Sequence, residues 1–239
     1  DRRMSIEACH VYTTVAGAIR SLQTARLRPS AGETLWPVDI YLPWIGHLVQ
    51  LTHDSSFHSL ARSATATGDR LPYHRRIWMV GSQGWLEDVI LHEFGHHVLK
   101  CLWRRQNPDA RMASVQTGED HHWDQPGGPT VAFQESWCNM FSYAMQPPGE
   151  HRTQFHTGEG GHDMVARGEG SDRENTEGCI TPFLVNLYRR HGLYFFWKAA
   201  AADYHADELS SFKDTYEEAL GDDSRKRDEF RQLLQEHGL

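Results

Sequence analysis

Apolar residues recur at three- and four-residue steps along the first segment of the chain, from Ile6 to Leu27. This period predicts a surface helix with one buried face. From Leu35 to Leu51, prolines and glycines interrupt the apolar residues, a pattern typical of short strands and turns. The β-branched and aromatic run from Arg76 to Val80 ends at glycines and predicts a further strand. The first third of the chain should therefore hold a helix and a small mixed sheet.

Two strongly apolar helices are predicted in the middle of the chain. The first, about Trp85 to Arg105, is apolar on nearly all sides and should lie buried at the centre of the fold. A polar stretch, about Asn107 to Thr130, separates it from a second helix, about Val131 to Met145. Residues Gln146 to Glu174 are rich in Gly, His and acids and poor in large aliphatics. They are expected to form a long loop that acts as a rim or lid.

Helical spacing returns at Thr181 and continues to the end of the chain, which predicts about three helices. Turn or cap signals fall at Gly192, Gly221 and Ser224. With strands in its first part and helices in the rest, the chain is expected to adopt an α+β fold.

Composition and charge narrow the class of protein. A length of 239 residues favours one domain, and we expect an N-terminal lobe of about residues 1–106, a C-terminal lobe of about residues 107–239 and an active-site cleft between them. Hydrophobic residues at 39% suffice for a packed core, and a formal net charge of −8 leaves no basic surplus for phosphates or anionic lipid. No apolar run approaches the roughly 18 residues that cross a bilayer. We expect a soluble monomer that binds neither nucleic acid nor membranes.

The predicted central helix contains His92-Glu93-Phe94-Gly95-His96, which has the pattern HExxH. Two histidines four residues apart lie on one helix face and can bind one zinc ion from adjacent corners of a tetrahedron. Glu93 then lies beside the metal, where it can act as general base on a water whose pKa zinc lowers towards roughly 7. A chance match on a solvated helix is the alternative. It is disfavoured because this helix is apolar, and burying these polar side chains unpaired is costly. One catalytic zinc ion is predicted.

A catalytic zinc needs a third protein ligand. The metzincin pattern HExxHxxGxxH is absent from the residues that follow His96. The cluster Glu119-Asp120-His121-His122 is one source, although it lies in a polar stretch. Glu135 is favoured, because it is a carboxylate at the start of an otherwise apolar helix, and a helix holds a ligand more rigidly than a loop. Asn139 lies one turn further on, where its amide oxygen can accept a hydrogen bond from the far nitrogen of a ligating histidine.

Three ordered segments resemble the gluzincin metallopeptidases, and more narrowly their secreted bacterial members. Residues 92–98 resemble the family pattern HEYGHHV, residues 132–137 resemble the start of AFSEGWADFFA, and residues 175–188 resemble VEGSVAAILWDLYD. In gluzincins the glutamate of the second helix is the third zinc ligand. The resemblance covers about residues 76–190.

By position, this resemblance implies that His92, His96 and Glu135 bind the zinc ion and that Glu93 is the general base. It also implies a zincin-like fold, hydrolysis of peptide bonds within polypeptides and a secreted protein.

The chain departs from the family pattern at two positions of the second motif. Asn139 stands where the family usually has Asp, and Ser136 stands where it has Gly. An amide in place of a carboxylate removes a charge behind the zinc-binding histidine, which bears on the reaction rate more than on metal binding. Two other functions therefore stay open: a toxin or effector protease restricted to one host protein, and a zinc-containing binding module without turnover.

Several roles stay open at the level of the sequence. A donor to the oxyanion of the transition state is needed, and the candidates are Tyr143, Tyr188, His151, His156 and His162. Glu177 matches a family glutamate and is expected either to fix the helices of the site or to cap a helix. His97 points about 100° away from its neighbour on the helix and is expected to be a core residue.

The four cysteines, Cys9, Cys101, Cys138 and Cys179, include no CxxC pair. Two disulfides in a secreted protein and four buried free thiols both fit this pattern. A bridge between Cys101 and Cys138, with Cys9 and Cys179 as the other pair, is one of three possible connectivities.

Overall fold

The computed structural model describes residues 2–27, 39–41, 57–61, 74–79, 85–103, 123–147, 153–157, 160–168, 172–202 and 208–239. Within them the helices are α1 (Arg2–Thr24), α2 (Glu87–Trp103), α3 (Pro129–Met145), α4 (Glu177–His191), α5 (Leu193–Ala202), α6 (Leu209–Leu220) and α7 (Ser224–His237), with a 3-10 turn η4 (Arg173–Asn175). The strands are β1 (Asp39–Tyr41), β2 (Phe57–Ala61), β3 (His74–Trp78), β4 (Gln154–Thr157) and β5 (Gly160–Asp163). The described chain is thus mainly helical with small sheets, an α+β fold.

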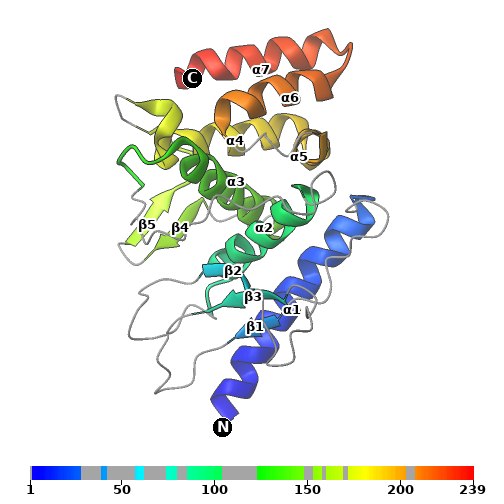
Figure 1. Cartoon of the computed structure of the whole chain (residues 1–239), viewed down its shortest axis with the longest axis vertical. Helices are drawn as coiled ribbons and strands as arrows, with labels where there is room; N and C mark the ends of the chain where they lie inside the picture. The colour runs from blue at the N-terminus through cyan, green and yellow to red at the C-terminus, as the bar shows by residue number, and fades with distance from the viewer. Residues whose placement is uncertain are drawn as a thin grey trace, which may run out of the picture.

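The elements are stacked along the long axis of the molecule (Figure 1). Helix α1 and the sheet β1–β3–β2 lie at the N-terminal end, α2 and α3 lie in the middle, and α4 to α7 cover the other end. One hydrophobic core runs through the described residues from α1 to α7. No helix in the described ranges combines the length and apolar character needed to cross a membrane.

The N-terminal elements largely match the predicted pattern. In α1 the apolar residues at helical steps are buried, among them Val15 and Leu22 at 0% exposure. Strand β3 pairs with β1 in parallel and with β2 in the antiparallel sense, so the predicted mixed sheet is confirmed. Strand β2 was not predicted, and most of the segment from Leu35 to Leu51 lies outside the described residues.

Helices α2 and α3 form the predicted buried pair and pack closely at Gly95. A Cβ atom on Gly95 would lie 3.2 Å from Phe141 Cδ1 and 3.3 Å from Cys138 Cα. Such spacings leave no slack for a larger side chain, so the glycine of the HExxH segment lets the two helix backbones approach each other. Helix α3 begins at Pro129, two residues before the predicted start, because proline is well suited to the first turn. Glu135 therefore lies in the second turn rather than at the helix start.

The prediction of a loop without core residues between Gln146 and Glu174 is wrong. Strands β4 and β5 form an antiparallel hairpin in this segment, with Phe155 opposite His162. Phe155 and Met164 are buried in the hydrophobic core. The segment lacks the β-branched alternation that marks a strand. Tertiary contacts between β4 and α2, rather than local strand propensity, hold the hairpin in place.

The C-terminal part contains four helices in the described ranges instead of the predicted three. Gly192 ends α4 with φ 73°, and α5 begins at the next residue. The signals at Gly221 and Ser224 are confirmed as the end of α6 and the start of α7. The signal at Gly192 is confirmed as the end of α4. The boundary between α5, which ends at Ala202, and α6, which begins at Leu209, was missed because no glycine or proline marks it in the sequence.

The four cysteines are free thiols. Cys9 is exposed, and Cys101, Cys138 and Cys179 are buried. The bridge considered between Cys101 and Cys138 is not formed, and the alternative of four buried thiols holds for three of them. Disulfides therefore supply no argument for an oxidising compartment.

Candidate metal centre

Two histidines of α2 and one glutamate of α3 meet in the middle of the fold. The Nε2 atoms of His92 and His96 are 3.1 Å apart. Glu135 Oε2 lies 2.9 Å from His92 Nε2 and 3.2 Å from His96 Nε2. The three residues are exposed by only 3% to 6%. The structure thus brings together the three predicted ligands, in a group that could hold a metal ion.

The donor set and its dimensions fit zinc. Zinc ligands lie about 2.0 to 2.1 Å from the ion, so neighbouring ligand atoms of a tetrahedron are about 3.3 to 3.4 Å apart. The three separations of 2.9, 3.1 and 3.2 Å are within a few tenths of an ångström of that spacing. Two imidazoles and one carboxylate also match the ligand types of catalytic zinc sites, which keep a fourth position open.

Asn139 fixes the ring orientation of His92. Asn139 Oδ1 lies 2.7 Å from His92 Nδ1, and an amide oxygen can only accept, so Nδ1–H donates. On its other side Asn139 Nδ2 donates to Glu177 Oε1 at 2.7 Å. Turning the amide over would place two acceptors in contact, so the carboxylate of Glu177 determines which way the amide points. The predicted hydrogen bond from the far nitrogen of His92 to the amide oxygen of Asn139 is thus present.

The hydrogen bond between His92 Nδ1 and Asn139 bears on His92 Nε2, the nitrogen that faces Glu135. A neutral imidazole protonated at Nδ1 carries a lone pair at Nε2. That lone pair points at Glu135 Oε2, another acceptor, at 2.9 Å. Two buried acceptors at this distance repel each other unless a cation lies between them. A proton on Nε2 or a metal ion between the atoms removes this repulsion, and the three residues form a group that could hold such an ion.

Glu93 and two further glutamates affect the pKa of one buried thiol, Cys138. Burial raises the pKa of the Cys138 thiol well above its ordinary value, and the carboxylates of Glu135, Glu93 and Glu177 raise it further. Carboxylates of α2, α3 and α4 thus all contribute to the electrostatic surroundings of this thiol. The raised pKa keeps the thiol protonated, so Cys138 is not a thiolate ligand.

Asp88, one turn before His92 on α2, is a residue that the sequence reasoning missed. It is fully buried, and its Oδ2 accepts hydrogen bonds from the backbone N of His156 at 2.8 Å and from His156 Nδ1 at 2.7 Å. Its backbone oxygen accepts from Ser142 Oγ of α3 at 2.8 Å. Asp88 thus ties β4 and α3 to the start of α2. The signal in the sequence was its spacing of four residues before His92, on the same helix face.

Phe155 is the second residue that was missed. Its ring lies 5.0 Å from the ring of His92, and the side chain is buried. The segment predicted as a rim therefore does reach the metal centre, as a packed strand.

The five candidates for the oxyanion donor occupy different surroundings. Tyr188 donates its hydroxyl hydrogen to the backbone oxygen of Ala144, and burial raises its pKa. Tyr143 lies edge-on against Tyr188. The ring of His162 is stacked on that of Trp123. His156 is held through Nδ1 by Asp88, and 42% of its side chain is exposed. His151 lies outside the described residues, as do Glu119, Asp120, His121 and His122.

His97 is confirmed as a core residue. It is 1% exposed and its ring contacts that of Phe94.

Gly178, beside Glu177, lies where three backbone segments meet. Its N–H donates to the backbone oxygen of Trp123 at 2.8 Å. A Cβ atom there would lie 2.5 Å from Trp123 Nε1 and 2.7 Å from the same backbone oxygen. The backbone of Gly178 also closely approaches Gly168. The glycine is required because no side chain fits, and it places the first turn of α4 against the chain before α3.

Gly178→Ala should therefore destabilise the protein by about 1 to 3 kcal/mol, the usual cost of overpacking. Urea unfolding measures this as a lower transition midpoint. Gly127→Ala is the matched control, because no atom lies within 4 Å of a Cβ built there. A stability for Gly178→Ala equal to that of the control would contradict the tight contact.

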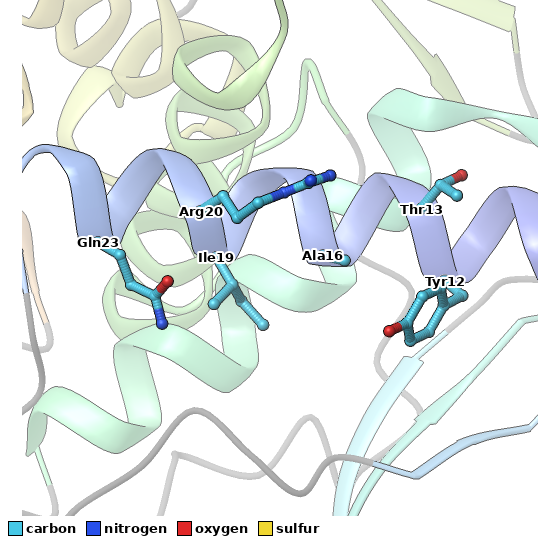
Figure 2. Close-up of a pocket in the computed structure, with 6 residues that line it drawn as sticks. All are labelled: Tyr12, Thr13, Ala16, Ile19, Arg20 and Gln23. Carbon is cyan, nitrogen blue, oxygen red and sulfur yellow. The ribbon is translucent and has the colours of Figure 1, made fainter.

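A separate hollow lies on α1 (Figure 2). It is lined by Tyr12, Thr13, Ala16, Ile19, Arg20 and Gln23, all from this helix. The Thr13 hydroxyl already donates to backbone oxygens of α1. The hollow contains none of the metal-centre residues, and we assign it no role in the chemistry.

Comparison of the chain with protein-family models, with curated proteins and with solved structures finds no match in any of the three. The geometry of His92, His96 and Glu135 is therefore the basis on which a function can be proposed.

Proposed function

We propose that the protein is a zinc-dependent peptidase of the gluzincin type. The observation that carries this proposal is the triangle of His92 Nε2, His96 Nε2 and Glu135 Oε2, with no edge longer than 3.2 Å. The tautomer imposed by Asn139 turns the lone pair of His92 towards its centre. The identity of the metal as zinc, the zincin-like fold and polypeptides as substrates are parts of the same proposal.

When bound, zinc would supply a Lewis acid that activates water and polarises the scissile carbonyl group. His92, His96 and Glu135 would hold it and leave the fourth position to water and substrate. Glu93 follows His92 directly on α2 and is 4% exposed. Its carboxylate would take a proton from the attacking water and pass it to the leaving amine, so that the peptide bond is cleaved without a covalent intermediate.

We assign the role of oxyanion donor to His156 among the five candidates. Asp88 engages its Nδ1, which leaves Nε2 as the nitrogen for a substrate, and the exposed fraction of the side chain gives access. With a proton on Nε2, His156 would donate a hydrogen bond to the developing oxyanion, while Asp88 holds the ring in place through Nδ1. The contact of neighbouring Phe155 with His92 keeps β4 against the metal centre.

The test is a digest of a peptide library by the purified chain, alongside its metal content. We expect about one zinc ion per chain, cleavage of many peptides, loss of cleavage on treatment with a zinc chelator and recovery when zinc is returned. In the same digest, His156→Phe should lower the cleavage rate and leave the zinc content unchanged.

Each other outcome has a defined meaning. Cleavage at one motif would replace the general endopeptidase with a restricted protease, and zinc without any cleavage would indicate a binding module. A chain that binds no zinc, or cleavage that survives removal of the metal, would refute the proposal.

A further inference from the structure

The two residues that depart from the family pattern, Asn139 and Ser136, both contact Glu177. Asn139 donates to the carboxylate of Glu177, and Ser136 Oγ donates to the backbone oxygen of the same residue at 3.3 Å. Asn139 and Ser136 are both 0% exposed, and Glu177 is 5% exposed. The two departures are therefore part of one buried contact between α3 and the first residue of α4.

We propose that Glu177 is a positioning residue that acts on the metal centre through Asn139. This inference rests on the proposed zinc site and adds to it a third helix. The chain of contacts runs from Glu177 Oε1 to Asn139 Nδ2 at 2.7 Å and from Asn139 Oδ1 to His92 Nδ1 at 2.7 Å. Glu177 orients the amide, the amide holds the proton of His92 on Nδ1, and the lone pair of Nε2 is thereby directed to the metal.

The two hydrogen bonds that link Glu177, Asn139 and His92 are called the relay below. Their donor and acceptor directions depend on which residue carries the negative charge. In this chain the inner member is a neutral amide and the outer member is a carboxylate. The amide needs an acceptor on its Nδ2 side, and Thr181 Oγ1, at 3.3 Å, is a longer contact than Glu177. Hydrogen bonds to charged groups are stronger than those to neutral ones, so the carboxylate is the main partner that fixes the amide.

A simple capping role for Glu177 makes a different prediction. As the first residue of α4, a glutamate interacts favourably with the helix dipole whatever residue occupies position 139. The relay instead makes the effect of Glu177 depend on residue 139, and this dependence is what an experiment can separate.

The test is a cycle of four chains: the parent, Glu177→Gln, Asn139→Asp and the double variant Asn139→Asp/Glu177→Gln. Zinc affinity is measured by competition with a chelator of known affinity. With Asn139 present, Glu177→Gln should weaken zinc binding by about 10-fold, at the lower end of the effect of residues behind metal ligands. With Asp at position 139, Glu177→Gln should strengthen zinc binding, because it removes one of two carboxylates in contact and leaves an amide to donate to the other.

Glu87→Gln is the matched control, because Glu87 is the first residue of α2 as Glu177 is of α4. It should change zinc affinity by no more than about two-fold, as expected of a substitution away from a buried network. If Glu177→Gln weakens zinc binding by a similar factor with Asn and with Asp at position 139, Glu177 acts as a helix cap and the relay is refuted.

A second measurement does not require the Asp variant to fold. The nitrogen chemical shifts of the His92 ring report the hydrogen bonding of each nitrogen. In the zinc-loaded parent, Nδ1–H should be hydrogen-bonded to Asn139 Oδ1, and in Glu177→Gln at the same zinc occupancy the Nδ1 shift should move towards that of an imidazole without this bond. An Nδ1 shift in Glu177→Gln equal to that of the parent would overturn the relay.

Failure of the relay and failure of the peptidase proposal are distinguishable. Equal zinc affinities in all four chains would refute the relay and leave the peptidase proposal intact. The expected pattern of affinities in a chain that cleaves no peptide would support the relay and refute the peptidase proposal.

Discussion

Replacing Glu93 by Gln is expected to lower the rate of peptide cleavage by about 10²- to 10⁴-fold, the usual contribution of a general base. Glutamine has the size and shape of glutamate but does not take up a proton at neutral pH. The buried position, at 4% exposure, should therefore keep its packing while the proton transfer is lost. The measurement is the cleavage rate of one library peptide, with the zinc content of the same sample.

The zinc content separates this role from that of a ligand. It should stay at about one ion per chain in Glu93→Gln, because the three ligand atoms come from other residues. Glu87→Gln, on the same helix, is the control for a lost carboxylate and should cleave at the parental rate. Parental activity in Glu93→Gln, or loss of its zinc, would show that Glu93 is not the base.

Replacing Glu135 by Ala is expected to abolish most of the stabilisation that zinc gives to the parent. Zinc at 1,000 times its Kd should stabilise the parent by about 4 kcal/mol, or about 10 °C in Tm for a chain of this size. Losing a direct ligand should weaken binding more than about 100-fold, since residues behind the ligands already account for 10- to 100-fold. At the same zinc concentration the gain for Glu135→Ala should thus fall to about a third or less. Thermal unfolding with and without zinc measures both chains.

The polar cluster of residues 119–122, the other predicted source of a third ligand, provides the control for Glu135→Ala. His121→Ala/His122→Ala removes the two imidazoles of the polar cluster and should keep the full rise in Tm with zinc. If this variant loses the rise and Glu135→Ala keeps it, the third ligand comes from the cluster instead.

Part of the centre was predictable because local spacing fixes it. His92 and His96 are four residues apart on one helix, so their proximity follows from the helical period alone. The third ligand required a choice between Glu135 and the polar cluster of residues 119–122. The rigidity of a helix and the resemblance to gluzincins favoured Glu135. The metal-binding geometry agrees with that choice, whereas catalysis stays a prediction.

The rest of the centre depends on long-range contacts that no local pattern encodes. Asp88 is one polar residue at the start of an apolar helix, and its role appears only when His156 is brought against it. The hairpin that carries Phe155 has few strand-forming residues and is held by tertiary contacts. Glu177 was recognised by resemblance, but its contact with Asn139 requires α4 to dock on α3.

The metal centre also closes the chain into loops. His92 and Glu135 are 43 residues apart in the sequence, and Asn139 and Glu177 are 38 apart. A metal bound between the first two would join α2 to α3 only while the chain is folded, so its stabilisation would depend on its affinity and concentration. A covalent bridge that closes a loop of this length gives about 4 kcal/mol in the chain-entropy model, comparable to zinc at about 1,000 times its Kd. In a protein whose four cysteines are free, the ion would then take the place of a covalent bridge between α2 and α3, and its loss would loosen the fold as reduction loosens a disulfide-bonded protein.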